Sequence, residues 1–137
     1  MAELITREER KKRLREAKNN LKAIFEDNTG KKLIYHAEKI ADLLGKKRNK
    51  NDFRRDMSTS QIRKLFAEVK RMKYYDPYEL SLLKAKLAYA AGRHNEVKDL
   101  QEVLNVALDN IINEETFLRF KHFFEAIIAY HTKFGRE

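Results

Sequence analysis

The scarcity of helix-breaking residues constrains this sequence more than any other feature. One proline and four glycines occur among 137 residues, and cysteine is absent. Leu, Ala, Lys, Glu and Arg, which favour helices, are abundant. No segment alternates between apolar and polar residues over a useful length, and no Asn-Gly or Asp-Gly hairpin turn occurs. We therefore expect an all-α fold, a compact bundle of five to six helices.

Helix-start signals divide the chain into six segments. Thr6 and Ser58 are each followed three residues later by Glu or Gln, which is the pattern of a capping box. Asp76 before Pro77 predicts a further helix start, with Glu79 reaching back to the N-cap. The expected helices cover about residues 6–28, 31–45, 58–73, 77–92, 96–112 and 114–134.

Apolar residues recur at helical spacing within these segments, so each helix is expected to turn one face inward. In the second helix that face is expected to include Ile34, and Asn95 is expected to cap the fifth helix. The last segment, TFLRFKHFFEAIIAYHTKF, is apolar or aromatic nearly all round. Such a helix either lies at the centre of a bundle or forms half of an oligomer interface. The central position is favoured.

Length and composition indicate one domain. A chain of 137 residues is long enough to bury a single core, so residues 1–137 are expected to form one helical domain with residues 46–57 as a basic, mobile connector.

Without cysteine, disulfides and thiolate metal sites are excluded. No stretch approaches the roughly 20 apolar residues of a membrane span, and the N-terminus lacks an apolar signal core. A cytoplasmic protein with no membrane partner is expected.

Motifs for catalysis or metal binding are sparse. None of the four histidines lies in an H-E-x-x-H arrangement, and His122 with Glu125 supplies two metal ligands at best. Glycine-rich phosphate loops and G-x-S-x-G elbows are absent. We therefore expect no catalytic residues, no metal site and no cofactor. A small metal-free enzyme using His94, His131 or Lys86 is a disfavoured alternative.

The basic residues are concentrated in the N-terminal half. Residues 1–75 contain 22 Lys and Arg against 11 Asp and Glu, whereas residues 76–137 contain 8 against 10. The stretch GKKRNKNDFRRDMSTSQIRK, residues 45–64, alone holds eight basic and two acidic residues. This asymmetry favours a surface for nucleic acid or another polyanion over a merely soluble surface. From charge alone, phosphate contacts are expected in the connector at Lys46, Lys47, Arg48, Arg54 and Arg55.

Helical geometry gathers further cations on the third and fourth helices. At about 100° per residue, the four cations of the third helix fall within roughly 120° of arc, opposite its apolar stripe. On the fourth helix, Lys86 and Arg93 share a face with Tyr89, which suits a sugar–phosphate backbone and a stacked base. The first helix is also basic, but interleaved glutamates compensate part of its charge. The candidates on the third helix are Arg63, Lys64, Lys70 and Arg71.

Three blocks of the sequence resemble a known family. STSQIRKLF (58–66), LLKAKLAYAAGR (82–93) and FLRFKHFFEAIIAYHTKFG (117–135) are similar, in order and spacing, to blocks of the small subunit of type III-A (Csm-type) CRISPR effector complexes. The resemblance covers roughly residues 30–135. It implies an all-helical, non-catalytic subunit whose several copies stack along the inner side of a filament, beside a guide RNA and its paired target. By motif it assigns the holding of RNA backbones to Arg63, Lys64, Lys86 and Arg93.

Three functional hypotheses follow, in this order. The first is the small subunit of a type III-A complex, with guide RNA, target RNA, the other subunits and further copies of itself as partners. As an isolated protein, such a subunit is expected secondarily to form a homodimer. The second is a generic basic helical RNA-binding protein, such as a ribosome- or tRNA-associated assembly factor. The third is the small enzyme described above.

Overall fold

The structure is a computed structural model of the whole chain, and it describes residues 4–45, 47–48 and 57–134. Helices make up most of this part of the chain, which confirms the expected all-α bundle. The α-helices are α1 (Arg7–Glu26), α2 (Lys31–Gly45), α3 (Thr59–Lys70), α4 (Pro77–Arg93), α5 (Lys98–Asp109) and α6 (Glu114–Phe134).

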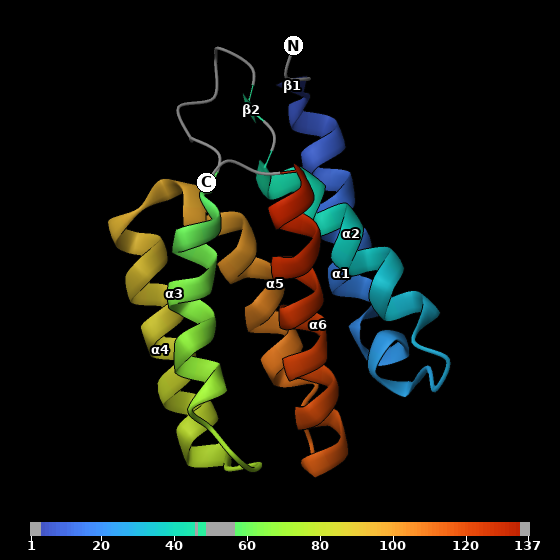
Figure 1. Cartoon of the computed structure of the whole chain (residues 1–137), viewed down its shortest axis with the longest axis vertical. Helices are drawn as coiled ribbons and strands as arrows, with labels where there is room; N and C mark the ends of the chain where they lie inside the picture. The colour runs from blue at the N-terminus through green and yellow to red at the C-terminus, as the bar shows by residue number, and fades with distance from the viewer. Residues whose placement is uncertain (1–3, 46, 49–56, 135–137) are drawn as a thin grey trace.

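The helices pack with α6 between α2 and α3, and with α5 between α1 and α4 (Figure 1). Helix α6 is the central element that its sequence predicts, because its apolar residues line the core. Five of its apolar side chains are at most 2% exposed: Phe117, Phe120, Phe123, Phe124 and Ile127. Leu118, on the opposite face of α6, is half exposed. The wide buried face of this helix therefore reflects packing against α1, α2 and α3, and Leu118 lies outside that face.

The helix starts follow the expected caps in part. At Ser58 the capping box is complete, since its Oγ accepts from the backbone N–H of Gln61 at 3.2 Å and the Gln61 side chain accepts from the Ser58 N–H at 3.0 Å. At Thr6 only half of the box forms. The Thr6 hydroxyl accepts from the Glu9 N–H, whereas the Glu9 carboxylate accepts from the side chain of Arg13. An ion pair within α1 thus replaces the second capping bond.

The start of α4 also differs in detail. The Asp76 carboxylate accepts from the backbone N–H of Tyr78 at 3.0 Å, and Pro77 occupies the first turn, as expected. The reciprocal bond expected from Glu79 is not formed among the described residues. Asn113 supplies a cap that the sequence prediction did not name, because its side chain accepts from the Thr116 N–H at 2.9 Å.

Two further expectations are wrong. Asn95 does not cap the fifth helix: residues Asn95–Val97 form a 3₁₀ turn (η1), and α5 begins only at Lys98. Ile34 is 42% exposed, whereas Leu33 beside it is buried. Helix α2 packs on both α1 and α6. Its buried face is therefore centred nearer Leu33, which leaves Ile34 at the margin.

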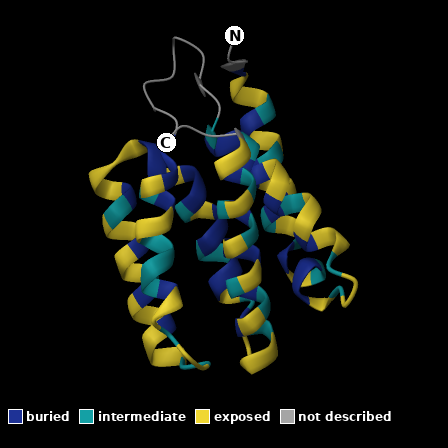
Figure 2. Ribbon diagram, in the orientation of Figure 1, coloured by how far each residue is buried: buried dark blue, intermediate teal, exposed yellow. Residues whose placement is uncertain are grey.

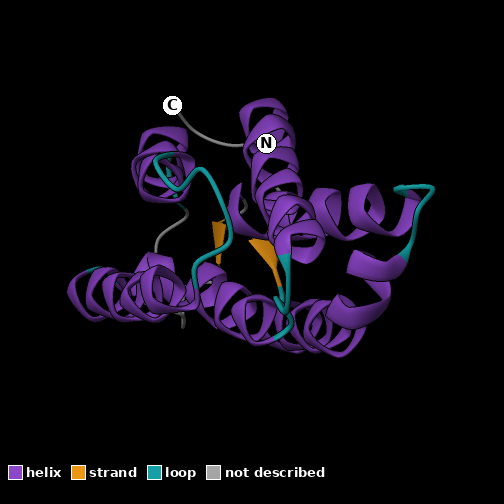
Figure 3. Ribbon diagram, turned by 90° about the horizontal axis from the view of Figure 1, so that it is seen from below, coloured by secondary structure: helices purple, strands orange, loops and turns teal. Residues whose placement is uncertain are grey.

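A short pair of strands at one end of the bundle was not expected. Strand β1 (Leu4–Ile5) pairs in parallel with β2 (Lys47–Arg48), with Leu4 opposite Lys47 and Ile5 opposite Arg48 (Figure 3). Strands of two residues carry no readable alternation, so the sequence could not reveal them. The pairing fixes the first residues after α2 against the segment that precedes α1.

None of the helices in the described ranges combines the length and the apolar run that crossing a bilayer requires.

Candidate nucleic-acid interface

The connector residues are only partly described. Lys46, Arg54 and Arg55 lie outside the described residues, and for Lys47 and Arg48 the structure describes the backbone as β2. The expected phosphate contacts in the connector therefore remain predictions.

The end of the connector is held by buried hydrogen bonds. The backbone N–H of Met57 donates to the carbonyl of Leu44 at 3.0 Å, which brings the start of α3 to the end of α2. His131 of α6 is fully buried beside this junction, with Nε2 2.9 Å from the Met57 carbonyl and Nδ1 3.1 Å from the Thr59 hydroxyl. A carbonyl only accepts, so Nε2 carries the hydrogen. These bonds fix the direction in which α3 leaves the connector.

The structure brings the two basic helices together. Lys86 Nζ of α4 lies 3.0 Å from Glu68 Oε2 of α3. Nearer the start of α3, the Gln61 side chain donates to Glu96, just beyond α4, at 2.9 Å. The two strips that the sequence indicates separately are therefore neighbours on one side of the molecule. Figure 2 shows exposed residues along the outer turns of both helices.

All six cations predicted on α3 and α4 are exposed. Lys64 of α3 and Arg71, the C-cap residue of that helix, are seven residues apart and share one face. Arg63 and Lys70 share the adjacent face. Glu68 follows Lys64 by four residues and points to α4. The face of Lys64 and Arg71 therefore borders α4, and the face of Arg63 and Lys70 lies farther round the helix.

These cations differ in their partners. Arg71 contacts both oxygens of Glu68 at 3.3 Å, and Lys86 contacts the same carboxylate. Arg93 donates to the Tyr89 hydroxyl at 3.2 Å, and its guanidinium lies 5.9 Å from the centre of that ring. The other three predicted cations, Arg63, Lys64 and Lys70, form no ion pair with the described residues.

Helix α1 is basic as well, but several of its cations are used within the fold. Arg10 pairs with Asp99 of α5 at 3.0 Å, and Arg13 pairs with Asp42 of α2 at 2.8 Å. Burial lowers the pKa of Arg13, but the hydrogen bonds and charges of Asp42 and Glu9 together outweigh it, so the pKa is raised above its ordinary value. These cross-helix pairs leave fewer cations of α1 available for phosphates than its sequence suggests.

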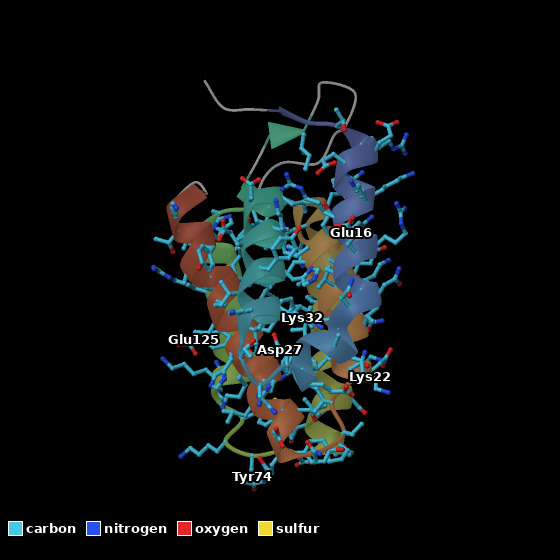
Figure 4. All side chains as sticks on the ribbon, turned by 90° about the vertical axis from the view of Figure 1, so that its right-hand side faces the viewer. Glu16, Lys22, Asp27, Lys32, Tyr74 and Glu125 are labelled. Carbon is cyan, nitrogen blue, oxygen red and sulfur yellow. The ribbon has the colours of Figure 1, made fainter. Side chains whose placement is uncertain are left out.

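A groove of about 390 Å³ lies where α3 ends and α4 begins. Cations and carboxylates both line it, so it does not present a uniformly positive wall. Tyr74, at its rim, lies at the end of the molecule (Figure 4) and is 66% exposed. The lining residues are Glu68, Arg71, Met72, Lys73, Tyr74, Asp76, Glu79, Leu83 and Lys86.

The residues of the enzyme alternative do not form one accessible site. His131 is fully buried and hydrogen-bonded through both ring nitrogens, whereas His94 and Lys86 are exposed on the α4 side. The described residues contain no group of three or more His, Asp and Glu side chains placed to hold a metal ion.

Sequence reasoning did not single out Glu68. The spacing of Glu68 and Arg71, three residues apart on one helix, was a readable signal for an ion pair. The contact of Glu68 with Lys86 was not readable, because it joins residues 18 positions apart on different helices.

The fold and this surface define a small, all-α protein whose exposed cations gather on two neighbouring helices. Comparison with known families places it more closely: the family described as Csm2 Type III-A matches residues 26–137. A curated relative, "CRISPR system Cms protein Csm2" of Streptococcus thermophilus, is 33% identical over 117 residues, which cover 78% of this chain and 94% of that protein. No solved structure matches the chain.

The chain therefore belongs to the Csm2 family and is a small subunit of a type III-A CRISPR complex. This confirms the resemblance seen in the three sequence blocks, and it makes the other subunits of that complex its partners. Helix α1 lies almost wholly outside the family match.

Proposed function

We propose that this chain is a non-catalytic subunit that holds the backbones of guide RNA and target RNA in the type III-A complex, and that several copies stack along the filament. The observation that carries the proposal is the set of exposed cations on α3 that have no ion pair with the described residues: Arg63, Lys64 and Lys70. Cations without a protein counter-charge attract phosphates and release their counterions on binding.

Backbone contact suits the role of such a subunit. A protein that accepts any guide sequence must bind phosphates and sugars, because contacts to base edges would restrict the sequences that it tolerates. Tyr89 is 67% exposed beside Arg93 and offers a ring on which a base of any identity can stack. We infer that Lys64, Arg71, Lys86 and Arg93 follow one backbone path along α3 and α4.

The stacking of copies is supported by exposed apolar residues at the start of α4 and on α6. Tyr78 is 72% exposed and Leu82 is 43% exposed on the outer face of α4, and Leu118 is 50% exposed on α6. We propose that these residues contact the neighbouring copy. In reconstituted complexes, Leu82→Asp is expected to reduce the copies per complex measured by native mass spectrometry. Ile34→Asp, at an equally exposed residue of α2, is the control.

The test of RNA binding compares two triple variants of the full chain that lose the same charge. Arg63→Gln, Lys64→Gln and Lys70→Gln remove the three α3 cations named above. The control removes three exposed cations of α1 that likewise form no ion pair with any described residue: Lys11→Gln, Lys12→Gln and Arg15→Gln. Affinity for a single-stranded 20-mer RNA is measured by fluorescence anisotropy between 50 and 200 mM salt.

For the wild type, we expect the logarithm of the affinity to fall by about 0.7 per log unit of salt for each phosphate contacted. The α3 variant is expected to lose at least about tenfold in affinity and about 2 in slope, since three contacts are removed. The α1 variant is expected to change both quantities less. Equal losses in the two variants, or strong discrimination between RNA sequences, would contradict the proposal.

A second experiment tests which RNA and proteins are bound to the chain in its host cell. Affinity-tagged wild-type chain, recovered from its host, is expected to bring guide RNA and the other effector subunits with it. Ribosomal particles or tRNA in their place would favour a generic RNA-binding protein, which the family match already disfavours.

A further inference from the structure

Glu68 is the only acidic residue in the sequence of α3, and its carboxylate lies between two cations of the candidate interface. Oε2 is 3.0 Å from Lys86 Nζ of α4, and both carboxylate oxygens are 3.3 Å from Arg71 Nη1. The Glu68 side chain is 31% exposed, so a ligand can reach this position from solvent. One anionic group thus bridges a lysine and an arginine from neighbouring helices.

This arrangement has the chemistry of a phosphate site already occupied by the protein's own carboxylate. A phosphodiester carries one negative charge and accepting oxygens, and Arg and Lys are its usual partners. We propose that Glu68 occupies the place of an RNA backbone phosphate between Arg71 and Lys86, and that RNA binding here requires the carboxylate to be displaced. This inference rests on the function proposed above.

The carboxylate is ionised when RNA arrives. The hydrogen bond from Lys86 is the largest cause of a lowered pKa for Glu68, and the charge of Arg71 lowers it further. Near neutral pH the competitor is therefore always charged. Displacement remains feasible, because ion pairs between partly exposed side chains contribute little to stability. Lys86 and Arg71 are 57% and 72% exposed, and solvent screens both contacts.

The position of Glu68 has a functional consequence. The cations Arg63, Lys64 and Lys70 are available at once, whereas Arg71 and Lys86 become available only when Glu68 moves. Glu68 therefore lowers the affinity of each copy for RNA. A subunit present in several copies along one RNA needs only weak affinity per copy, since the linked sites act together.

The test compares two substitutions that remove one negative charge from the same groove. Glu68→Gln removes the competing carboxylate, and Glu79→Gln removes an exposed carboxylate of α4 that forms no ion pair with the described residues. Each full-length variant is titrated with a single-stranded uridine 20-mer at several salt concentrations. Circular dichroism melting checks that both variants are folded.

We expect Glu68→Gln to bind the RNA about threefold to tenfold more tightly than wild type, the gain of releasing two screened ion pairs. Its salt slope should steepen by up to about 1.4, for two further phosphate contacts. Glu79→Gln is expected to show a smaller increase in RNA affinity and a smaller change in salt slope. Equal gains in the two variants, or no gain at Glu68→Gln, would overturn the proposal.

A double-variant series separates this role from a bracing role between α3 and α4. If Glu68 competes for Lys86, the gain from Glu68→Gln must shrink when Lys86→Gln is already present. A gain that is unchanged in that background overturns the inference. Glu68→Asp keeps the charge, but its shorter side chain reaches Lys86 and Arg71 less well. It is expected to increase RNA affinity by a smaller factor than Glu68→Gln. This variant replaces Glu68→Gln in the test if Glu68→Gln does not fold.

A different result would contradict the proposed RNA-binding function itself: wild type and every variant would bind no RNA at 50 mM salt. In that case the carboxylate has no ligand to compete with, and the inference falls with it. If wild type binds and the α3 triple variant does not, the function stands, and the comparison of Glu68→Gln with Glu79→Gln decides the inference alone.

Discussion

Arg10 of α1 and Asp99 of α5 form a buried ion pair across 89 positions of sequence, with Arg10 Nη1 3.0 Å from Asp99 Oδ1. The two side chains are 7% and 2% exposed. Removing one partner of a buried ion pair is strongly destabilising, because the other charge stays in the interior and loses that counter-charge. This pair therefore fixes the start of α1 against the C-terminal half of the chain.

We predict that Arg10→Met lowers the free energy of unfolding by about 3–5 kcal/mol, because Asp99 would remain buried without this partner. Urea unfolding followed by circular dichroism measures the change. The double variant Arg10→Met, Asp99→Leu is expected to recover part of the loss, since apolar side chains then replace both members of the pair. Lys18→Met, at the more exposed pair with Glu102, is the control and should cost less than about 1 kcal/mol.

The same experiment bears on domain organisation. Apolar residues of α1 belong to one core cluster together with residues of α5 and α6, so we propose that the whole chain folds as a single domain. One cooperative urea transition is expected. Two resolved transitions, with α1 unfolding first, would contradict the proposal.

His131 is predicted to hold the exit of the connector. Replacing it with Phe removes the hydrogen bonds to the Met57 carbonyl and the Thr59 hydroxyl, so the free energy of unfolding should fall by about 2–4 kcal/mol. Hydrogen exchange should also quicken at the backbone amides of residues 57–62. His122→Phe, at an exposed histidine of the same helix, is the matched control. Unchanged exchange at residues 57–62 would count against this role.

Asp27 is predicted to make stability depend on pH. Its carboxylate accepts hydrogen bonds from the Lys32 N–H, and from the hydroxyl and N–H of Thr29, at the turn between α1 and α2 (Figure 4). These bonds, that from Lys32 first, lower the pKa of Asp27 from 3.8 to about 2. Because the pKa of Asp27 is lower in the folded state, its ionised carboxylate stabilises the fold. This contribution to the free energy of unfolding is present in full above about pH 4 and is lost as the pH falls towards and below 2.

Asp27→Asn should therefore be less stable than wild type at pH 7, and the difference should narrow below pH 4 and disappear as the pH falls through 2. Urea midpoints measured across this range provide the check. Glu125→Gln, at an exposed carboxylate of α6, is the matched control. A difference between Asp27→Asn and wild type that stays constant to pH 2 would show that the charge is not involved.

Tyr89 is predicted to stack on an RNA base, as an extension of the proposed function. Tyr89→Ala should weaken RNA binding by about 1–3 kcal/mol, whereas Tyr89→Phe should retain most of the affinity because it keeps the ring. Tyr35→Ala is the matched control, since Tyr35 is 54% exposed on α2 with Lys39 5.6 Å from its ring centre. Equal losses at Tyr35 and Tyr89 would remove the case for stacking at α4.

The sequence by itself determined the helices and the class of protein. The full capping box at Ser58 and the Asp76-Pro77 start were readable because a cap bonds only to a backbone group two or three residues away. The exposure of Arg63 and Lys64 followed from helical periodicity, which is equally local. The order of the three sequence blocks was enough to identify the family.

Only the tertiary structure decided how these parts meet. It placed α3 beside α4, enclosed His131 at the connector exit, joined Arg10 to Asp99 and set Glu68 between Arg71 and Lys86. It also turned Ile34 outward and delayed the start of α5 to Lys98. The physical reason is range: caps and helix faces depend on neighbours within about four residues, whereas partners on different helices depend on how whole helices pack.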